Sequence, residues 1–92
     1  MNIADANVLI TGASRGLGRA MAIAFAEAGA GVIFINHLND QDSAEKTQEL
    51  VRAHGAKAEI LEADVTDPAA VAAMAASVSR HLMGQVFECT SQ

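Results

Sequence analysis

A glycine-rich segment near the start of the chain carries the residues whose types and spacing could do chemistry. An apolar run at 8–10 leads directly into Thr-Gly-Ala-Ser-Arg-Gly-Leu-Gly at 11–18. Gly12 lets the chain turn sharply off a strand, Gly16 removes a Cβ where a phosphate must approach the backbone, and Gly18 lets the next helix pack closely. The start of that helix offers free N–H groups and the positive end of its dipole. The segment therefore predicts a phosphate-binding turn.

Two other phosphate-binding motifs are excluded by the residues of this segment. A P-loop needs a Lys-Ser or Lys-Thr pair after its glycines, and none follows here. The common dinucleotide motif G-x-G-x-x-G is not matched either, because Met21 stands where its third glycine would be. The pattern that remains is Thr11-Gly12-x-x-x-Gly16-x-Gly18.

Apolar runs and helical stripes alternate around this turn. Strands are predicted at 8–10, 32–35 and 58–63. The apolar stripes of three helices follow them, made of Leu17, Met21, Ala24 and Ala28, then Ala44, Thr47, Leu50 and Val51, then Val71, Met74, Ala75, Val78 and Leu82. Gly29 suits the C′ position of the first helix, Asp67 the N-cap of the third and Pro68 its first turn.

The predicted order of elements is β-α-β-α-β-α, a partial Rossmann fold of the doubly wound α/β class with a parallel sheet. A fourth strand is only weakly indicated at 86–89, because Glu88 places a charge within it. Residues 85–92 form an atypical tail. If the fourth strand is lost, the strand at 8–10 becomes an exposed apolar edge, and we expect self-association through that edge.

Composition limits the size and the partners of the protein. Its 92 residues, with a formal net charge of −5, allow one small domain and make nucleic acid an unfavourable ligand. The apolar-rich stretch at 69–79 is too short to cross a membrane, and the first ten residues do not read as a signal peptide. The single cysteine, Cys89, cannot form an internal disulfide, and no metal site is predicted. These features favour a cytoplasmic protein.

The glycine pattern, together with Asp64-Val65 at the end of the third strand, resembles the short-chain dehydrogenase/reductase family. The resemblance is closest to the 3-oxoacyl-carrier-protein reductase type, which often has T-G-A-S-R-G at this turn. It covers residues 1 to about 86. It implies that residues 1–92 are the N-terminal NAD(P)-binding half of such a domain, truncated after the third helix.

The resemblance also implies a dinucleotide site. The pyrophosphate and ribose would lie against Gly12, Ser14, Arg15, Gly16, Leu17 and Gly18. Asp64 would accept a hydrogen bond from the adenine amino group, since a carboxylate is an acceptor only, and Val65 would cover the ring. Asp64 could instead be a loop residue that supports the start of the next helix.

The charges near the end of the second strand favour NADP over NAD. An NAD site places a carboxylate there, on the ribose 2′-hydroxyl, but the residues here are Asn36 and His37. The nearest acid, Asp40, has the position of a loop or capping residue. Arg15 could face the 2′-phosphate of NADP, with Asn36 or His37 adding a hydrogen bond, or it could be a solvated surface charge. Arg19 is expected to be a solvated helix residue.

The catalytic residues of the family are missing from the sequence. Family enzymes use a Tyr-x-x-x-Lys pair and a serine, but this chain has no tyrosine, and its lysines are Lys46 and Lys57. The first interpretation is therefore the cofactor-binding half of an NADP-dependent carbonyl or alcohol oxidoreductase, inactive alone. The alternative is a non-catalytic nucleotide-binding or subunit-interaction module.

Overall fold

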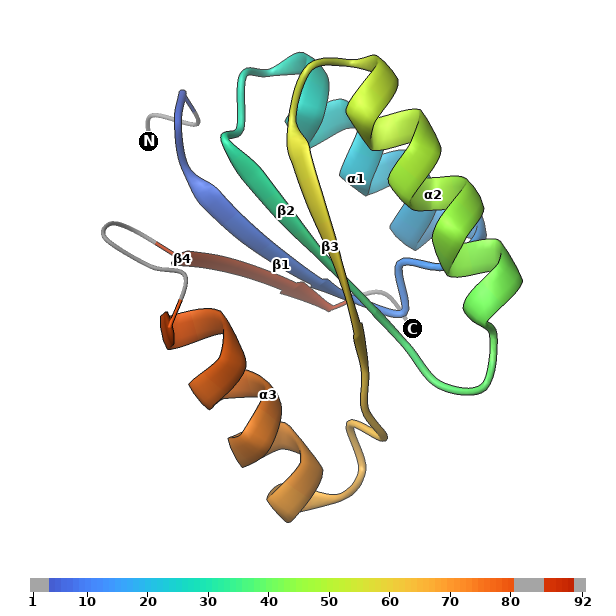
Figure 1. Ribbon diagram of the computed structural model, residues 1–92, viewed down its shortest axis with the longest axis vertical. Helices are drawn as coiled ribbons and strands as arrows, with labels where there is room; N and C mark the ends of the chain where they lie inside the picture. Colours follow the sequence, from blue (N-terminus) through green and yellow to red (C-terminus); the bar gives the residue numbers. More distant parts are fainter. Residues whose placement is uncertain (1–3, 81–85, 91–92) are drawn as a thin grey trace.

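The computed structural model describes residues 4–80 and 86–90. Strands and helices alternate along these residues (Figure 1), as predicted. The elements are β1 Asn7–Thr11, α1 Gly16–Glu27, β2 Val32–His37, α2 Gln41–Ala53, β3 Lys57–Glu62, α3 Pro68–Arg80 and β4 Val86–Thr90.

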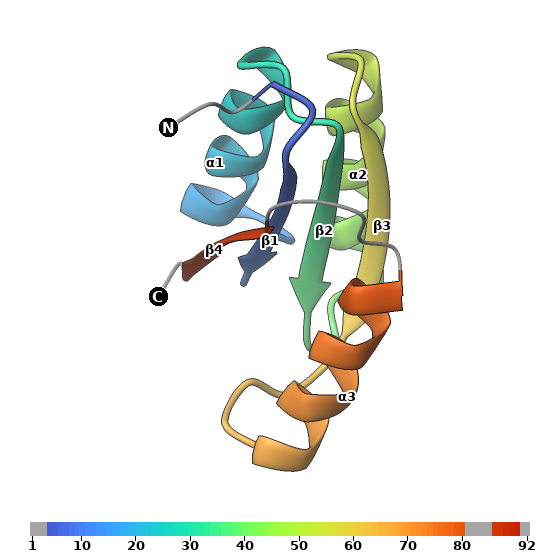
Figure 2. The same ribbon diagram turned by 90° about the vertical axis from the view of Figure 1, so that its left-hand side faces the viewer.

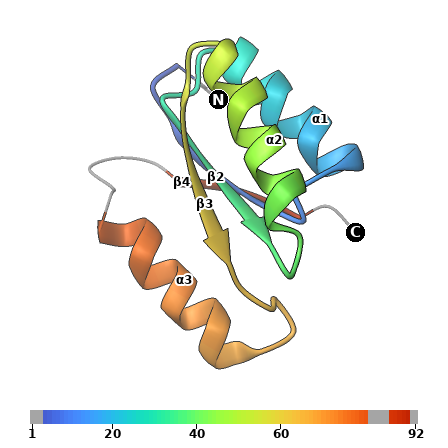
Figure 3. The same cartoon turned by 45° about the vertical axis from the view of Figure 1, so that its right-hand side comes forward.

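The strands form one sheet in the order β3-β2-β1-β4, and every pair of neighbours is parallel. Helices α1 and α2 lie beside each other on one face of the sheet, and α3 lies on the other face (Figures 2 and 3). Helices on both faces of an open parallel sheet confirm the partial Rossmann fold. Because the strands are parallel, the turns that follow β1, β2 and β3 meet at one edge of the sheet.

The weakly indicated fourth strand is present as β4, and it corrects one prediction. It pairs with β1 from Asn7 opposite Val86 to Thr11 opposite Thr90. The strand β1 therefore lies between β2 and β4, and the prediction that residues 8–10 form an exposed edge is wrong. A parallel ladder is made by backbone groups, so a charged residue within β4 does not prevent pairing. Residues 85, 91 and 92 of the expected tail lie outside the described residues.

Alternate residues of β1 and β2 point to opposite faces of the sheet and build two hydrophobic clusters. The cluster under α1 and α2 contains the strand residues Val8, Ile10, Ile33 and Ile35. The cluster under α3 contains Leu9, Phe34, Met74 and Val78. Burial on both faces explains why these strands are continuous apolar runs without polar alternation.

The predicted apolar stripe of α1 is wrong except at Met21. The buried residues of this helix are Gly18, Ala22 and Ala26. Leu17, the first residue of the predicted stripe, is 65% exposed. A Cβ on Gly18 would lie 2.2 Å from the carbonyl oxygen of Gly12. Only glycine therefore fits at this point, where the helix approaches the end of β1. Met21 of the predicted stripe is half-buried and packs against the cluster under α1 and α2, whereas Ala24 and Ala28 are exposed.

The predictions for α2 are largely confirmed, and those for α3 are confirmed in part. In α2 the buried residues are Ala44, Thr47 and Val51. Asp67 caps α3, because its Oδ1 accepts a hydrogen bond of 3.0 Å from the backbone N–H of Ala69. In α3 Met74 and Val78 are buried, Val71 and Ala75 are exposed, and Leu82 lies outside the described residues.

Candidate nucleotide-binding site

A cavity of about 880 Å³ lies at the edge of the sheet where β1, β2 and β3 end. Its walls come from residues within 11–17, 36–40 and 63–66. All the predicted site residues except Gly16 and Gly18 line it. In open parallel sheets this edge is where ligands bind, because the turns supply backbone N–H groups and side chains from several strands.

The turn between β1 and α1 leaves the start of the helix open. Gly12 and Gly16 have φ angles of +66° and +61°, which L side chains rarely adopt. A Cβ on Gly16 would meet no atom within 4 Å, so this glycine borders open space. Arg15 occupies the N-cap position, but its side chain makes no capping hydrogen bond and the first turn holds no acid. The N–H groups of the first turn and the helix dipole are therefore available to an anion.

The side chains of Arg19 and Thr47 hold the turn in place through hydrogen bonds. The carbonyl oxygen of Ser14 accepts hydrogen bonds from Arg19 Nη2 at 2.7 Å and from Thr47 Oγ1 at 2.8 Å. Arg19 also donates from Nε to Thr47 Oγ1 at 2.9 Å and from Nη2 to the carbonyl of Ser43 at 3.0 Å. The prediction that Arg19 is a solvated residue is wrong, because its guanidinium joins α1, α2 and the turn.

Asn36 joins the ends of three strands. Its Oδ1 accepts a hydrogen bond from the Gly12 N–H at 3.3 Å, and its Nδ2 donates to the carbonyls of Leu61 and Ala63 at 3.3 and 3.1 Å. The side chain is buried. Asn36 therefore holds the turn after β1 against the turn after β3. Its predicted hydrogen bond to the cofactor remains a prediction.

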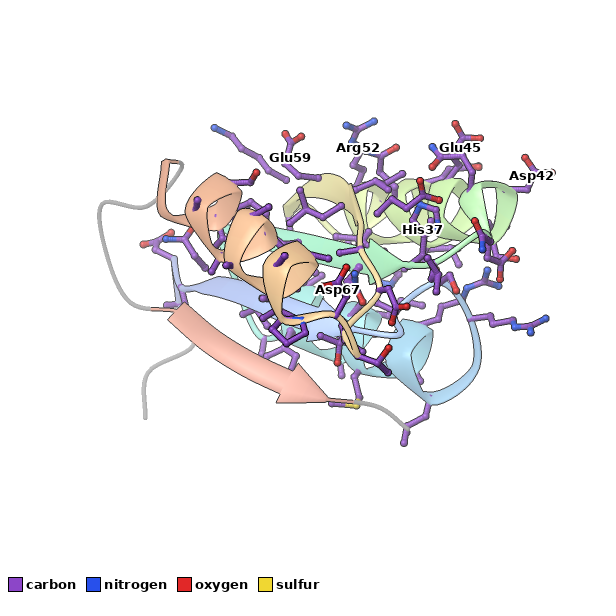
Figure 4. The ribbon with its side chains drawn as sticks, turned by 90° about the horizontal axis from the view of Figure 1, so that it is seen from below. His37, Asp42, Glu45, Arg52, Glu59 and Asp67 are labelled. Atoms are coloured by element: carbon purple, nitrogen blue, oxygen red, sulfur yellow. The ribbon has the colours of Figure 1, made fainter. Side chains whose placement is uncertain are left out.

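His37 orders the chain between β2 and α2. Its Nδ1 accepts a hydrogen bond of 3.1 Å from the Asp40 N–H, so the ring proton lies on Nε2, which donates to Gln41 Oε1 at 2.9 Å. The ring is buried. Figure 4 shows His37 at the end of β2, whereas Asp42 and Glu45 point outward from α2. Both ring nitrogens are engaged within the chain, and a contact of His37 with the cofactor remains a prediction.

Asp40 lies closer to the glycine-rich turn than its sequence position indicates. It is the N-cap residue of α2, as expected, but its Oδ2 also accepts a hydrogen bond of 3.3 Å from Ser14 Oγ. Arg15 Nε lies 3.7 Å from the same oxygen. Hydrogen bonding from the Ser43 side chain is the main cause that lowers the pKa of Asp40, and the Arg15 charge and the Ser14 hydroxyl lower it further.

Asp64 forms a tight turn after β3. Its Oδ1 accepts hydrogen bonds from the N–H of Thr66 at 2.9 Å and from Thr66 Oγ1 at 2.6 Å. These bonds, the hydroxyl bond first, lower the pKa of the Asp64 carboxyl below its ordinary value. Both bonds fall on Oδ1, so Asp64 can support the turn and still offer Oδ2 to a ligand in the cavity.

Three apolar side chains stand exposed on the three walls of the cavity. Leu17, Leu38 and Val65 are 65%, 50% and 40% exposed. Large apolar side chains left in water beside polar groups are suited to a ligand with flat rings and sugars. Leu38 was not predicted, although a single apolar residue in the polar stretch after the second strand was a usable signal.

The described residues contain no group of three His, Cys, Asp or Glu side chains that could hold a metal ion. Within the same ranges, no helix is long and apolar enough to cross a membrane.

Comparison with known proteins identifies relatives that match most of the chain. Versicolorin reductase 1 of Aspergillus parasiticus is 44% identical over 73 residues, which are 79% of this chain and 28% of that protein. The uncharacterized oxidoreductase YgfF of Escherichia coli is 37% identical over 79% of this chain and 29% of its own length.

A solved structure shares the fold. A dehydrogenase of Burkholderia cenocepacia with bound NADP superimposes with a TM-score of 0.83 at 35% identity, over 87% of this chain and 31% of that one. The chain thus spans less than a third of the length of these relatives. Residues 6–86 match the short chain dehydrogenase family. The protein therefore belongs to the short-chain dehydrogenase family.

Proposed function

We propose that this chain binds NADP in the cavity at the edge of the sheet, as the cofactor-binding part of an NADP-dependent carbonyl or alcohol oxidoreductase. The open start of α1 carries this proposal. Gly16 borders open space there, and no side chain caps the first turn. A pyrophosphate is the ligand that such a helix start favours, because free N–H groups and the helix dipole act on the same charge.

The residues around the cavity fit the rest of a dinucleotide. The exposed side chains of Leu17, Leu38 and Val65 would contact the rings and sugars, and Asp64 would accept a hydrogen bond from the adenine amino group. Arg15 would face the 2′-phosphate. The bound cofactor would supply the hydride for the reduction of a carbonyl group.

The reductase type of the whole protein is a further part of the proposal. The Thr-Gly-Ala-Ser-Arg-Gly turn at 11–16 supports the 3-oxoacyl-carrier-protein reductase type. The alternative is a non-catalytic nucleotide-binding or subunit-interaction module. It is favoured by the absence of tyrosine from these 92 residues, because the family's acid/base is a tyrosine.

Calorimetric titration of NADP⁺ into the purified chain tests the proposal with a matched pair of variants. Gly16 and Gly55 both have positive φ angles, and a Cβ on either would meet nothing within 4 Å. Gly16→Ala should weaken binding by about tenfold or more, because it disturbs hydrogen bonds to a charged group. Gly55→Ala carries similar backbone strain outside the cavity and should change the Kd by less than about twofold. Equal losses in both variants, or no binding by the unsubstituted chain, would refute the proposal.

A further inference from the structure

Three polar side chains meet at one end of the cavity, where the turn after β1 approaches the turn after β2. Ser14 Oγ donates to Asp40 Oδ2 at 3.3 Å, and Arg15 Nε lies 3.7 Å from the same oxygen. The cation that would receive a 2′-phosphate is thus already next to a carboxylate. The sequence lacks an acid at the end of β2, but the fold brings one there from three residues further along.

The carboxylate is the more buried and more firmly held member of this pair, and the guanidinium is the exposed one. The N–H of Asp40 donates to His37 Nδ1 at 3.1 Å, and His37 is itself buried and bonded to Gln41. The side chain of Asp40 is 30% exposed, whereas that of Arg15 is 80% exposed. Arg15 can therefore move to follow a ligand, but Asp40 keeps its negative charge at this end of the cavity.

The Asp40 charge acts in opposite directions on the two forms of the cofactor. A phosphate that reaches Arg15 also comes close to Asp40, and like charges repel. A free ribose 2′-hydroxyl is a donor, which a carboxylate accepts. We propose that Asp40 is a specificity-determining residue that opposes Arg15, disfavouring the 2′-phosphate and favouring the 2′-hydroxyl. This inference rests on the proposed function and concerns the adenosine end of the same site.

A pair of adenosine ligands tests the inference without the nicotinamide. Adenosine 2′,5′-bisphosphate and 5′-AMP differ by the 2′-phosphate, and both are titrated by calorimetry into the chain and into Asp40→Asn. The Kd of the bisphosphate should fall by about 3- to 20-fold in Asp40→Asn, since one nearby negative charge is removed. The Kd of 5′-AMP should stay the same or rise. Asp42→Asn is the matched control, because Asp42 is exposed on the first turn of α2 and does not line the cavity.

The outcomes separate this inference from the proposed function. If the unsubstituted chain binds neither ligand, the proposed function fails and the inference fails with it. If it binds both and Asp40→Asn leaves their ratio of Kd values unchanged, only the inference is overturned. An equal shift in Asp42→Asn would also overturn it, because the effect would then be one of net charge. Asp40→Ser keeps an oxygen suited to a helix N-cap and should shift the ratio in the same direction, which excludes a fault in the start of α2 as the cause.

Discussion

Arg19 on α1 and Thr47 on α2 are joined by a hydrogen bond of 2.9 Å from Nε to Oγ1, and both donate to the carbonyl oxygen of Ser14. Thr47 is fully buried, and its hydroxyl is used as both donor and acceptor. The glycine-rich turn therefore has a fixed position that does not depend on a bound ligand. A preformed turn reduces the ordering that binding would otherwise require.

The first prediction concerns the hydrogen bonds that Thr47 makes with Arg19 and Ser14. Thr47→Val keeps the shape of the side chain but removes the hydroxyl, which leaves Arg19 Nε without its acceptor and removes one of the two hydrogen bonds to the Ser14 carbonyl. We expect a loss of about 1–3 kcal/mol in the free energy of unfolding, the usual cost of leaving a buried group unsatisfied. Urea denaturation measures it. Thr47→Ser retains the hydroxyl and should recover most of the loss, and a loss in Thr47→Ser as large as that in Thr47→Val would contradict the role of the hydrogen bonds.

The second prediction concerns whether replacing Gly18 with alanine raises or lowers the stability of the chain. In an exposed helix position, alanine is more stable than glycine by about 1 kcal/mol. Gly18→Ala should instead destabilise the chain by about 1–3 kcal/mol, because its Cβ would lie 2.2 Å from the Gly12 carbonyl oxygen, and that backbone cannot give way cheaply. Thermal unfolding by circular dichroism measures the change. Ala20→Gly, at an exposed position of the same helix, should show the ordinary propensity cost. A stabilised Gly18→Ala chain would show that the helix can move off the turn.

The sequence predicts the backbone of the site better than its side chains. The strands and the turn at 11–18 are predicted correctly because β-branched runs and spaced glycines determine the backbone conformation locally. Arg19 was misjudged and Leu38 was missed, because their roles depend on which helices and turns the fold brings together. The weak signal for β4 has the same origin, since pairing with β1 comes from the sheet and not from the composition of residues 86–90.

Asp40 shows most directly what its position in the sequence does not predict. Sequence position indicates a loop or capping residue, and the structure confirms the N-cap position. Its approach to Arg15 depends on two turns from different strands meeting at one edge. The residues next to the end of β2 therefore do not alone set the charge around the cofactor, because the fold also places Asp40 there.

The third prediction concerns pH. The pKa of Asp64 is lowered by its bonds from Thr66, from an ordinary value of 3.8. A depressed pKa in the folded state stabilises the chain above the ordinary value, and this contribution is lost as the pH falls from 3.8 through the folded-state pKa. Asp64→Asn should therefore be less stable than the unsubstituted chain near neutral pH, and the difference should shrink in acid. Denaturation at a series of pH values measures it, and Thr66→Ala should flatten the same part of the profile. A difference that is constant with pH would contradict the assignment.

The fourth prediction concerns Arg15. Arg15→Ala should weaken binding of NADPH by about 10- to 150-fold, because the free energy of a hydrogen bond to a charged group corresponds to that ratio. Binding of NADH should change little, because only NADPH carries the 2′-phosphate. Calorimetric titration of both cofactors measures the two changes. Lys46→Ala removes a positive charge from an exposed position on α2 and is the control. Equal losses for NADPH and NADH in Arg15→Ala would reject the role of Arg15 in specificity.

The last prediction is that the purified chain gives no reductase turnover even when NADPH is bound. Hydride delivery to a carbonyl leaves an alkoxide that must be protonated or stabilised as it forms, and a positioned general acid contributes about 10²- to 10⁴-fold to that step. The family's acid is a tyrosine, and this sequence has none. Both nitrogens of His37, the histidine that lines the cavity, are engaged within the chain. More cofactor cannot restore a missing acid, so loss of NADPH absorbance with acetoacetyl thioesters should match a protein-free control at every cofactor concentration. Steady turnover that Gly16→Ala abolishes and Gly55→Ala leaves intact would show that the chain supplies its own acid.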